Sequence, residues 1–568
     1  MRWRLIVLFL CVGAWPRGAA AQLVAPCRGQ RIDSIRVITS APTVTGLRRV
    51  PLAGPFVRSI HVVTRDEIVR GFLLLDVGDR CSELRRAESE RILRAQPFLA
   101  DADIVVLPSR RGGVLLEVRT IDDISIIFSG SVSGSSPNVR SARLGSSNLA
   151  GLGITTAFGW KHDPVYDDHL QGRFVDHQLF GQPYVLDLQS SRNPFGRDDY
   201  AQLSLPFRTD VQRLAWRGLV GETRAHAQFA ARDTGRIALG FDRSFAEAGS
   251  IFRIGPPGKL ALVGVSFTNE HTMVDTNVVR ITDLGFRPDT AALLLSRFAE
   301  SRAARVNALI GLRWLRFLRV RGFDALRGSQ DVPIGLQLGT LVGRGVSAFG
   351  ADSRDMFVAS DLYIGIGNRS GVFRLQAQAE GRRATGGDAW DGLIGTGRFS
   401  GHVRASDRRT HIFSLEWSGT EGVLLPHALA LGSPEGGLRG YSRTEEYGGR
   451  RGIARLEEQI FLGSPFDYGD AGISLFVDAG QLWPGDLPYA QRTTVRAAAG
   501  ISLLVAVPMR STRMWRLEVA APINPPRGES RVEIRLRHAD LTSFFWREPA
   551  DVHSARARAV PASVYNWP

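Results

Sequence analysis

Apolar and polar residues alternate with a period of two along most of this chain, from about residue 124 onward. A period of two places successive side chains on opposite faces of a β-strand. The alternation is clearest in ISLFVDAG (473–480), MWRLEVAA (514–521) and RVEIRLR (531–537), and turns rich in glycine, aspartate, asparagine and proline separate such stretches. The sequence therefore predicts a mainly β protein.

A soluble β-sandwich would also alternate, with its polar face in water. Here the polar face combines charges with glycines in strand after strand, which is typical of a transmembrane barrel with lipid outside and a wet lumen. We therefore predict an antiparallel transmembrane β-barrel over 124–546, of about 16 strands, its first and last strands at 124–134 and 530–546. Residues 283–300 have helical periodicity and are predicted to form a large loop. Aromatic residues placed toward strand ends, as in an aromatic girdle, are Trp515, Phe544, Phe545 and Trp546.

Residues 27–122 have a different pattern, which predicts a small α/β domain with the order strand, helix, helix, strand, strand. The first helix is expected to begin at a capping box formed by Thr64 and Glu67. The second is expected to begin at Ser82. A stretch containing proline and glycine, 41–60, interrupts the domain after its first strand.

The first residues have the pattern of a secretory signal peptide, predicted over 1–21. Two arginines precede a short apolar core, and Ala19 and Ala21 occupy the small-residue cleavage positions. A retained membrane anchor is the alternative, although the core is shorter than the ~20 residues that a span needs. Cys27 and Cys81 would remain after cleavage, and an even pair in an exported chain predicts one disulfide, with two free thiols as the alternative.

The formal net charge is +15, and almost all of the cations are arginine. The charges are spread along the strands instead of being clustered, so nucleic acid is not an expected partner. No later segment contains about 18 consecutive apolar residues, so a closed barrel is the expected way to cross a membrane.

One loop, EGGLRGYS (435–442), presents Arg439 among three glycines, followed by Tyr441. Asp478 lies on the polar face of a following strand, where a carboxylate in a confined lumen needs a cation or several donors. The planar fork of an arginine can bind a carboxylate through two bonds. We therefore expect the loop to fold into the barrel and bind Asp478, with Glu457 or Glu458 as a second partner; a flexible external loop is the alternative.

Three short motifs occur along the chain: Leu438-Arg439-Gly440-Tyr441 in the loop, Phe476, Asp478 and Gly480 on a following strand, and Asn148, Gly151 and Gly153 near the start of the barrel. At these residues the chain resembles the BamA/TamA superfamily of outer-membrane assembly and secretion barrels, also called the bacterial surface antigen family. The N-terminal domain resembles the periplasmic POTRA module of that superfamily, so the resemblance covers nearly the whole mature chain.

The resemblance implies a protein that inserts or translocates client proteins at the outer membrane. The N-terminal domain would lie in the periplasm and capture unfolded clients, and the first and last strands would separate to template them. Outer-membrane lipid is an implied partner; accessory lipoproteins and the identity of the client are left open. The chain departs from the family in having a single POTRA-like domain, the insertion 41–60 and a tail at 547–568.

A passive porin or structural barrel is the alternative function. An outer-membrane enzyme is disfavoured: no Gly-x-Ser-x-Gly motif is present, and no catalytic residue, metal site or cofactor is expected. The densest group of ligand-like residues, HDPVYDDH (162–169), is interpreted as a solvated turn between two strands.

Overall fold

The computed structural model describes residues 25–557 except 42–61, 134–138, 164–166, 195, 231–235, 283–284, 291, 324, 385–386, 388, 433–435, 442–445, 466–467, 524, 526–530, 540–545 and 547. The predicted signal peptide (1–21) and residues 42–60 of the predicted insertion lie outside these residues.

The N-terminal part folds as a four-stranded sheet packed against two helices. The sheet order is β2-β1-β4-β3, in which β1 and β4 are parallel and the outer pairs are antiparallel. This is the predicted order along the chain, strand, helix, helix, strand, strand, with one short extra strand. The bounds are β1 (Arg28–Ser40), α2 (Asp66–Arg70), β2 (Arg80–Ser82), α3 (Glu83–Arg94), β3 (Leu99–Pro108) and β4 (Val114–Asp122).

The sheet and helices enclose an apolar core, to which α3 contributes the buried Ile92 and Leu93. A disulfide joins Cys27, just before β1, to Cys81 in β2. The predicted capping box is absent, because the residue before α2 is Arg65 and no side chain caps the helix. The hydroxyl of Thr64 instead donates to Asp122 at the end of β4, 2.7 Å away.

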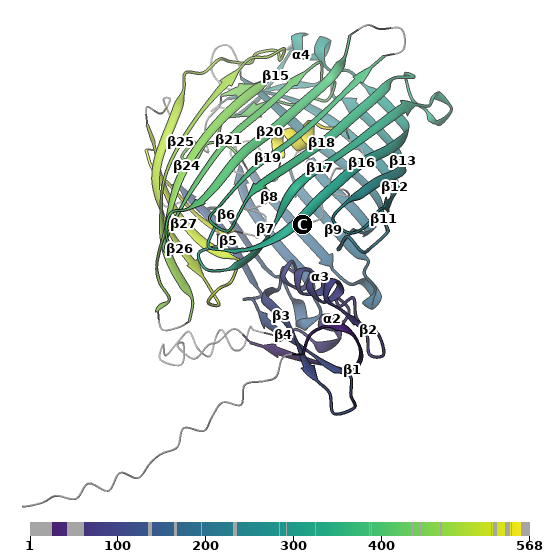
Figure 1. Ribbon diagram of the computed structural model, residues 1–568. Coiled ribbons are helices and arrows are strands. Elements are labelled where there is room, and N and C mark those ends of the chain that lie inside the picture. Colours follow the sequence, from purple (N-terminus) through teal and green to yellow (C-terminus); the bar gives the residue numbers. More distant parts are fainter. Residues whose placement is uncertain are drawn as a thin grey trace, which may run out of the picture.

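The rest of the chain forms a closed antiparallel barrel of 20 strands (Figure 1). The wall strands are β5 (Ile126–Ser133), β6 (Val139–Ser146), β7 (Ile154–Asp163), β8 (Asp167–Asp176), β9 (Val185–Asn193), β10 (Gly196–Leu205), β11 (Leu214–Ala230), β12 (Arg236–Ile254), β13 (Leu260–Val274), β16 (Ser301–Arg321), β17 (Ser329–Gly345), β18 (Met356–Gly367), β19 (Gly371–Arg383), β20 (Asp391–Arg404), β21 (Arg409–Glu421), β24 (Arg450–Gly463), β25 (Asp470–Trp483), β26 (Arg496–Ala506), β27 (Met514–Ile523) and β28 (Glu533–Ala539).

The remaining elements are short and lie between wall strands. The hairpin β14–β15 extends the sheet beyond β12, and it is followed by α4 inside the segment 283–300 that was predicted to be a helical loop. Their bounds are η2 (Leu149–Gly151), η3 (Leu179–Gly181), β14 (Val278–Thr282), β15 (Gly285–Asp289), α4 (Ala292–Arg297), η4 (Ser347–Phe349), β22 (Leu429–Ala430) and β23 (Tyr447–Gly448).

The predicted count of about 16 strands is wrong, although the five strands expected after the arginine loop are present as β24–β28. The error lies before the loop, where nine strands, β5–β13, and then six, β16–β21, complete the wall. Strands such as β10, GRDDYAQLSL, are polar along much of their length. Alternation marks such strands weakly, so their number could not be read from the pattern.

The alternating faces point as predicted, with the apolar face outward. On β25, Leu475 and Val477 are about half exposed, whereas Phe476 and Asp478 between them are buried inside the barrel. On β28, Ile534 is exposed and Glu533 is buried. A closed barrel with an apolar outer surface and charged residues inside is a membrane-spanning structure.

Among the described residues, no helix is long and apolar enough to cross a membrane.

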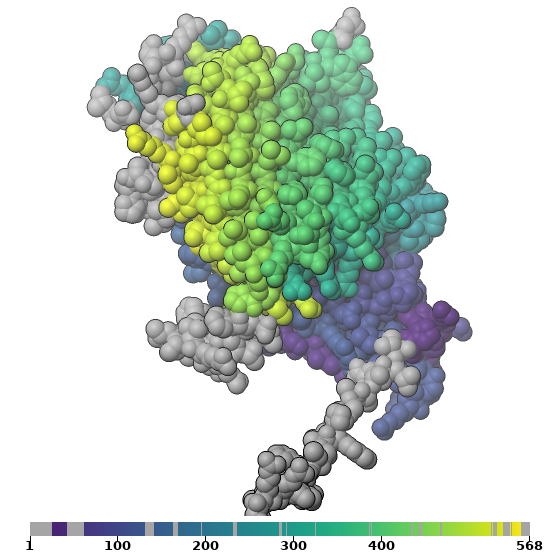
Figure 2. Space-filling model, turned by 60° about the vertical axis from the view of Figure 1, so that its left-hand side comes forward, coloured from purple at the N-terminus to yellow at the C-terminus, as the bar shows by residue number. Residues whose placement is uncertain are grey.

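The N-terminal domain packs against one end of the barrel, where it appears in purple below the wall (Figures 1 and 2). The described part of the last strand is Glu533–Ala539, and residues 540–545, with Phe544 and Phe545, lie outside the described residues, so the predicted continuation of this strand to Trp546 stays a prediction. Within the predicted tail, residues 548–557 are described and include α5 (Ala550–Ala555), a short yellow helix seen inside the barrel in Figure 1.

Candidate functional site

The arginine loop connects β21 to β24 and folds into the lumen. The Arg439 guanidinium donates two hydrogen bonds to Asp478 on β25, both 2.7 Å long. A third, of 3.1 Å, goes from its Nη1 to Glu457 on β24. The structure therefore brings together the three charged residues selected from the sequence, and Glu457 is the second partner. Glu458 faces the other way and lies 3.7 Å from Arg409.

The Phe476 ring lies under the same guanidinium, whose Cζ is 3.6 Å from the ring centroid. A cation over an aromatic face is attracted by the ring quadrupole, more strongly where water is excluded. The ring has room because the neighbouring β26 residue is Gly500; a Cβ there would lie 2.3 Å from Phe476. Phe476 thus supports Arg439 from below while Asp478 binds it from the side.

Gly440 and Tyr441 extend the contacts of the loop to the last three wall strands, β26–β28. The Gly440 N–H donates to Glu533 on β28, 2.9 Å away. Gly440 has a φ of 84°, which glycine adopts without steric cost. The Tyr441 hydroxyl lies 2.8 Å from the carbonyl oxygens of Ala497 on β26 and Ile523 on β27. The four-residue motif therefore contacts every strand from β24 to β28.

The apolar part of the motif is buried against other described residues of the loop. Leu438 and Tyr441 are fully buried in a cluster that includes Leu429 and Leu431. Gly480 on β25 lies close to the loop: a Cβ at that position would lie 3.2 Å from both the Leu431 side chain and the Gly452 carbonyl oxygen, so these neighbours would have to shift. The glycine of this second motif thus provides space for the loop.

A network of alternating charges surrounds Arg439, and the sequence reasoning did not assign most of its members. Arg516 lies 2.7 Å from Glu457, and Glu518 lies 3.6 Å from Arg439. Their positions on the polar face of MWRLEVAA were the only signal that could have identified them. Further members are Arg455, Glu416 and Arg537, each in an ion pair within the network. Cations and carboxylates alternate, so each buried charge has a partner of opposite sign.

The barrel closes where β28 meets β5, and the register there is short. Four residue pairs join the two strands, from Glu533↔Ser133 to Leu536↔Gly130, whereas β27–β28 and β5–β6 each align over seven pairs. Within the described residues, Ile126–Ser129 of β5 have register partners on β6 alone. The arginine loop therefore contacts β28, through Gly440 and Glu533, beside the wall junction with the fewest register pairs among the described residues.

The barrel-start motif contacts the N-terminal domain. The Asn148 side-chain amide donates to the Thr64 hydroxyl, 2.8 Å away, and its oxygen accepts from Gly153 N–H. The carbonyl of Gly151 accepts from the Arg65 N–H at 3.0 Å. Gly153 has a φ of 68°, and a Cβ there would lie 3.1 Å from Ile68 and 3.3 Å from Phe98. The motif thus joins the barrel to the segment around α2.

A second turn has the same shape and the same neighbour. The turn at η3 repeats the pattern of η2, with a polar residue, a leucine, a residue of positive φ and a glycine: Gln178-Leu179-Phe180-Gly181 follows Asn148-Leu149-Ala150-Gly151. The Gln178 amide donates to the carbonyl of Ile68 at 3.1 Å. We call η2 and η3, with Asn148 and Gln178, the paired turns.

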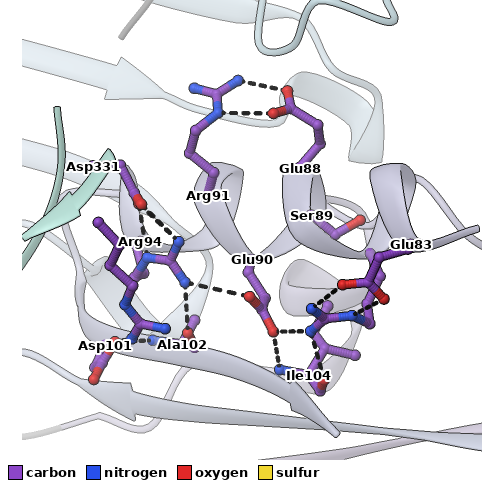
Figure 3. Close-up of polar contacts among 12 residues, drawn as sticks. Glu83, Glu88, Ser89, Glu90, Arg91, Arg94, Asp101, Ala102, Ile104 and Asp331 are labelled. Carbon is purple, nitrogen blue, oxygen red and sulfur yellow. Dashed lines mark hydrogen bonds and ion pairs between the residues drawn. The ribbon is translucent and has the colours of Figure 1, made fainter. Parts of the chain in front are cut away.

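Helix α3 fixes the other side of the domain to the barrel through charged contacts (Figure 3). Arg94 donates two bonds to Asp331 at the start of β17, of 2.8 and 3.0 Å. Arg91 lies with its Cζ 4.2 Å from the Phe317 ring of β16 and donates to the Arg208 carbonyl at 2.9 Å. The same helix face holds Glu90, whose pKa is raised by burial despite its bond to the Ile104 N–H.

No group of three or more metal-ligating side chains occurs among the described residues. Residues 162–163 and 167–169 of this group lie at the facing ends of β7 and β8, with the exposed Asp168 3.4 Å from His162, and residues 164–166 lie outside the described residues.

No family model and no curated protein matches the chain. Solved structures similar to it include BamA from Haemophilus ducreyi lacking POTRA domains 1-3, with 13% identity, a TM-score of 0.41 and coverage of 89% of this chain and 84% of that chain. CdiB from Escherichia coli has 15% identity, a TM-score of 0.45 and coverage of 89% and 76%. CdiB from Acinetobacter baumannii has 12% identity, a TM-score of 0.39 and coverage of 89% and 74%. These TM-scores lie below 0.5, so they carry no argument about this protein.

Proposed function

We propose that this protein inserts or translocates client polypeptides at the outer membrane and has no enzymatic activity. The N-terminal domain receives the client on the periplasmic side, and the β5–β28 junction separates to pair with it. The arginine loop holds the closing strands in position while this occurs. The observation that carries the proposal is the contact of one loop with all five closing strands, ending at Glu533 beside the short junction.

The junction suits this function for a physical reason. Backbone N–H and C=O groups of a strand edge pair readily with an incoming strand, and proteins normally protect such edges. Within the part of the chain that the structure describes, four residue pairs join β28 to β5, against seven between β27 and β28, so separating β28 from β5 breaks fewer of the described backbone hydrogen bonds. A client strand that paired with β5 would replace the backbone hydrogen bonds that β5 loses when β28 separates from it.

A passive porin fits the same geometry less well. A porin needs an open lumen, whereas this lumen contains the arginine loop and its charge network, and a domain is docked at one end. The resemblance of the three motifs to the BamA/TamA superfamily also supports insertion or secretion.

Depletion of the protein in its own host, followed by quantification of outer-membrane and secreted proteins, tests the proposal. Loss of many β-barrel proteins would indicate general assembly, and loss of one or a few exported proteins would indicate a dedicated translocator. If no other protein changed in abundance, the proposal would be wrong and the porin would be favoured.

A disulfide across the junction provides a sharper test. The pair Val132→Cys and Ile534→Cys occupies facing register positions on β5 and β28. We expect the oxidised variant to fail to complement the depletion and the reduced variant to succeed. The matched control is Ile501→Cys with Val519→Cys, a facing pair on β26 and β27, which should complement in both states.

A further inference from the structure

Residues 548–557 lie inside the barrel, against the arginine loop. Val552 and Ala555 of α5 are buried in the same apolar cluster as Leu438 and Tyr441. Pro549 contacts the loop so closely that a Cβ at Gly436 would lie 3.0 Å from the Pro549 Cβ. The segment is therefore packed into the lumen on top of the loop.

Charged residues of the wall bind this segment at three points, the first of which is Asp551. Arg451 on β24, which is 2% exposed, binds both carboxylate oxygens of Asp551 at 2.6 and 3.0 Å. Asp551 also accepts from the Ala430 N–H at 3.2 Å. A paired, two-bond arginine–carboxylate contact fixes both the position and the orientation of the segment.

The second point is the end of α5. Arg243 on β12, which is also 2% exposed, donates to the carbonyl oxygens of Ser554 and Arg556. These are orphan carbonyls at a helix end, which have no partner within the helix. Arg243 thus acts as a cap supplied by the barrel wall.

The third point is Arg556. Its guanidinium lies within 2.8 Å of both Glu548 oxygens and 3.2 Å from Glu380 on β19. The other oxygen of Glu380 accepts from the Ala557 N–H at 2.9 Å. Glu380 is 8% exposed, so the wall presents a buried carboxylate to the arginine of the segment.

These three points lie on distant parts of the wall. Seven strands, β13 and β16–β21, separate β12 from β24 in the order of the barrel, and β19 lies among them. One ten-residue segment, 548–557, therefore bridges strands on different sides of the lumen; its helix is the short yellow helix in Figure 1.

We propose that the barrel lumen contains a peptide-binding site, which the chain's own residues 548–557 occupy and thereby close. Its ligand class is a short peptide that carries an aspartate and, five residues later, an arginine, which the wall residues Arg451, Glu380 and Arg243 recognise. The segment buries Pro549, Val552 and Ala555 and is otherwise held by polar contacts. When residues 548–557 leave the lumen, water replaces them and hydrates the charged wall residues. The vacated site is therefore filled with water. The inference does not depend on the proposed function, because a passive barrel would contain the same closure.

Ion conductance in planar lipid bilayers tests this proposal directly. The variant that lacks residues 547–568 should conduct several-fold more current than the intact protein. A synthetic peptide of residues 547–557 should restore the block, whereas the same peptide with Asp551→Lys and Arg556→Glu should not. Heat-modifiable gel mobility checks that the shortened barrel is folded. Equal currents from the folded shortened and intact proteins would overturn the proposal.

A second pair of full-length variants keeps the test independent of truncation. Asp551→Lys places a cation against Arg451 and should raise the conductance. Adding Gly436→Cys and Pro549→Cys to this variant should keep the lumen closed when oxidised and open it on reduction, since the two Cβ atoms would lie near disulfide distance. If oxidation and reduction left the current of this triple variant unchanged, the segment would not be the closure. The conductance measurements do not test client insertion, which the depletion experiment tests separately.

Discussion

At the scale of single residues, the Arg439 fork is the best example of how chemistry is placed in this molecule. One side chain binds a carboxylate on β25 and another on β24, and lies over an aromatic ring. A lysine at this position would keep the charge and lose the planar two-bond geometry. Asp478 is 0% exposed, so its charge depends on the arginine that the loop delivers.

Replacing Arg439 by alanine should destabilise the barrel strongly, because the buried Asp478 would lose the two bonds from its cation, while Glu457 would keep its contact with Arg516. Breaking a buried pair by removing one partner costs about 3–5 kcal/mol. The expected result is a lower temperature for the shift in heat-modifiable gel mobility, with Arg439→Lys intermediate. The control is Arg450→Ala, which removes an exposed arginine paired with the exposed Glu421 and should change the temperature little. Equal effects of Arg439→Ala and Arg450→Ala would contradict this account.

His177 should make the junction between domain and barrel sensitive to acid. Burial, followed by the nearby Arg208, Arg173 and Arg513, lowers the pKa of His177 to about 3, from about 6.5 in an unfolded chain. The unfolded chain therefore takes up a proton first. The contribution of neutral, buried His177 to the free energy of unfolding is fully present above pH 6.5 and is lost as the pH falls toward 3.

Hydrogen exchange measures this loss. His177 lies beside Phe98 of the N-terminal domain, with ring centroids 6.2 Å apart. We expect residues 65–75 to exchange faster at pH 5 than at pH 7.5, after correction for the intrinsic rate, and His177→Gln to reduce the difference. An unchanged difference in the variant would assign the acid sensitivity to other groups.

At the scale of elements, two short turns of the barrel form part of its interface with the N-terminal domain. The paired turns η2 and η3 have the same backbone shape, and each presents one amide side chain to the segment around α2. The same shape recurs because each turn must reverse the chain tightly and leave a polar side chain pointing at the neighbouring domain. The barrel-start motif is thus a docking feature as well as a turn.

Two glycine substitutions, at Gly153 just after η2 and at Gly181 in η3, separate these two roles. Gly153→Ala and Gly181→Ala each place a Cβ at a φ near +70°, at a cost of about 1–2 kcal/mol. Only the Cβ at 153 would meet the N-terminal domain, since nothing lies within 4 Å of the one at 181. We expect limited proteolysis near α2 to accelerate in Gly153→Ala and to change little in Gly181→Ala. Equal acceleration would show that turn strain, and not docking, controls the interface.

At the scale of the whole molecule, the N-terminal domain and the barrel are each stabilised by their own interactions. The N-terminal domain has a separate apolar core and the Cys27–Cys81 disulfide, while the barrel is held by its continuous hydrogen-bonded wall and by the loop inside it. Arg94–Asp331 and the paired turns join the two halves. The stability of one half is therefore separable from that of the other.

Replacing both cysteines by serine should destabilise the N-terminal domain and leave the barrel intact. Loss of a native disulfide from a small exported domain typically costs about 2–5 kcal/mol. Proteolysis should remove the domain from the variant at temperatures where the intact protein resists. Heat-modifiable mobility of the barrel should be unchanged; a shift of several degrees would mean that the two halves unfold together.

Local pattern was enough to predict several features of this protein. Alternation identified the apolar outer face and the charged inner face, because side-chain direction in a strand follows from its period of two. The need of a buried carboxylate for a cation suggested the pairing of Arg439 with Asp478, and the resemblance of the motifs favoured it over an external loop. The pairing of Cys27 with Cys81 was predicted from their even number in a chain expected to be exported. The five closing strands were also correct, since their alternation is strong.

Tertiary structure decided the rest, because those features depend on residues far apart in the sequence. Thr64 binds Asp122 and Asn148 instead of capping its helix, since a buried polar partner competes with a local one. The count of 20 strands follows from the pairing of strands around the closed wall, and the sequence of one polar strand does not show this pairing. Residues 548–557 show no periodicity that indicates a lumen. Their place inside it is set by Arg451 and Glu380, about 100 and 176 residues away along the chain.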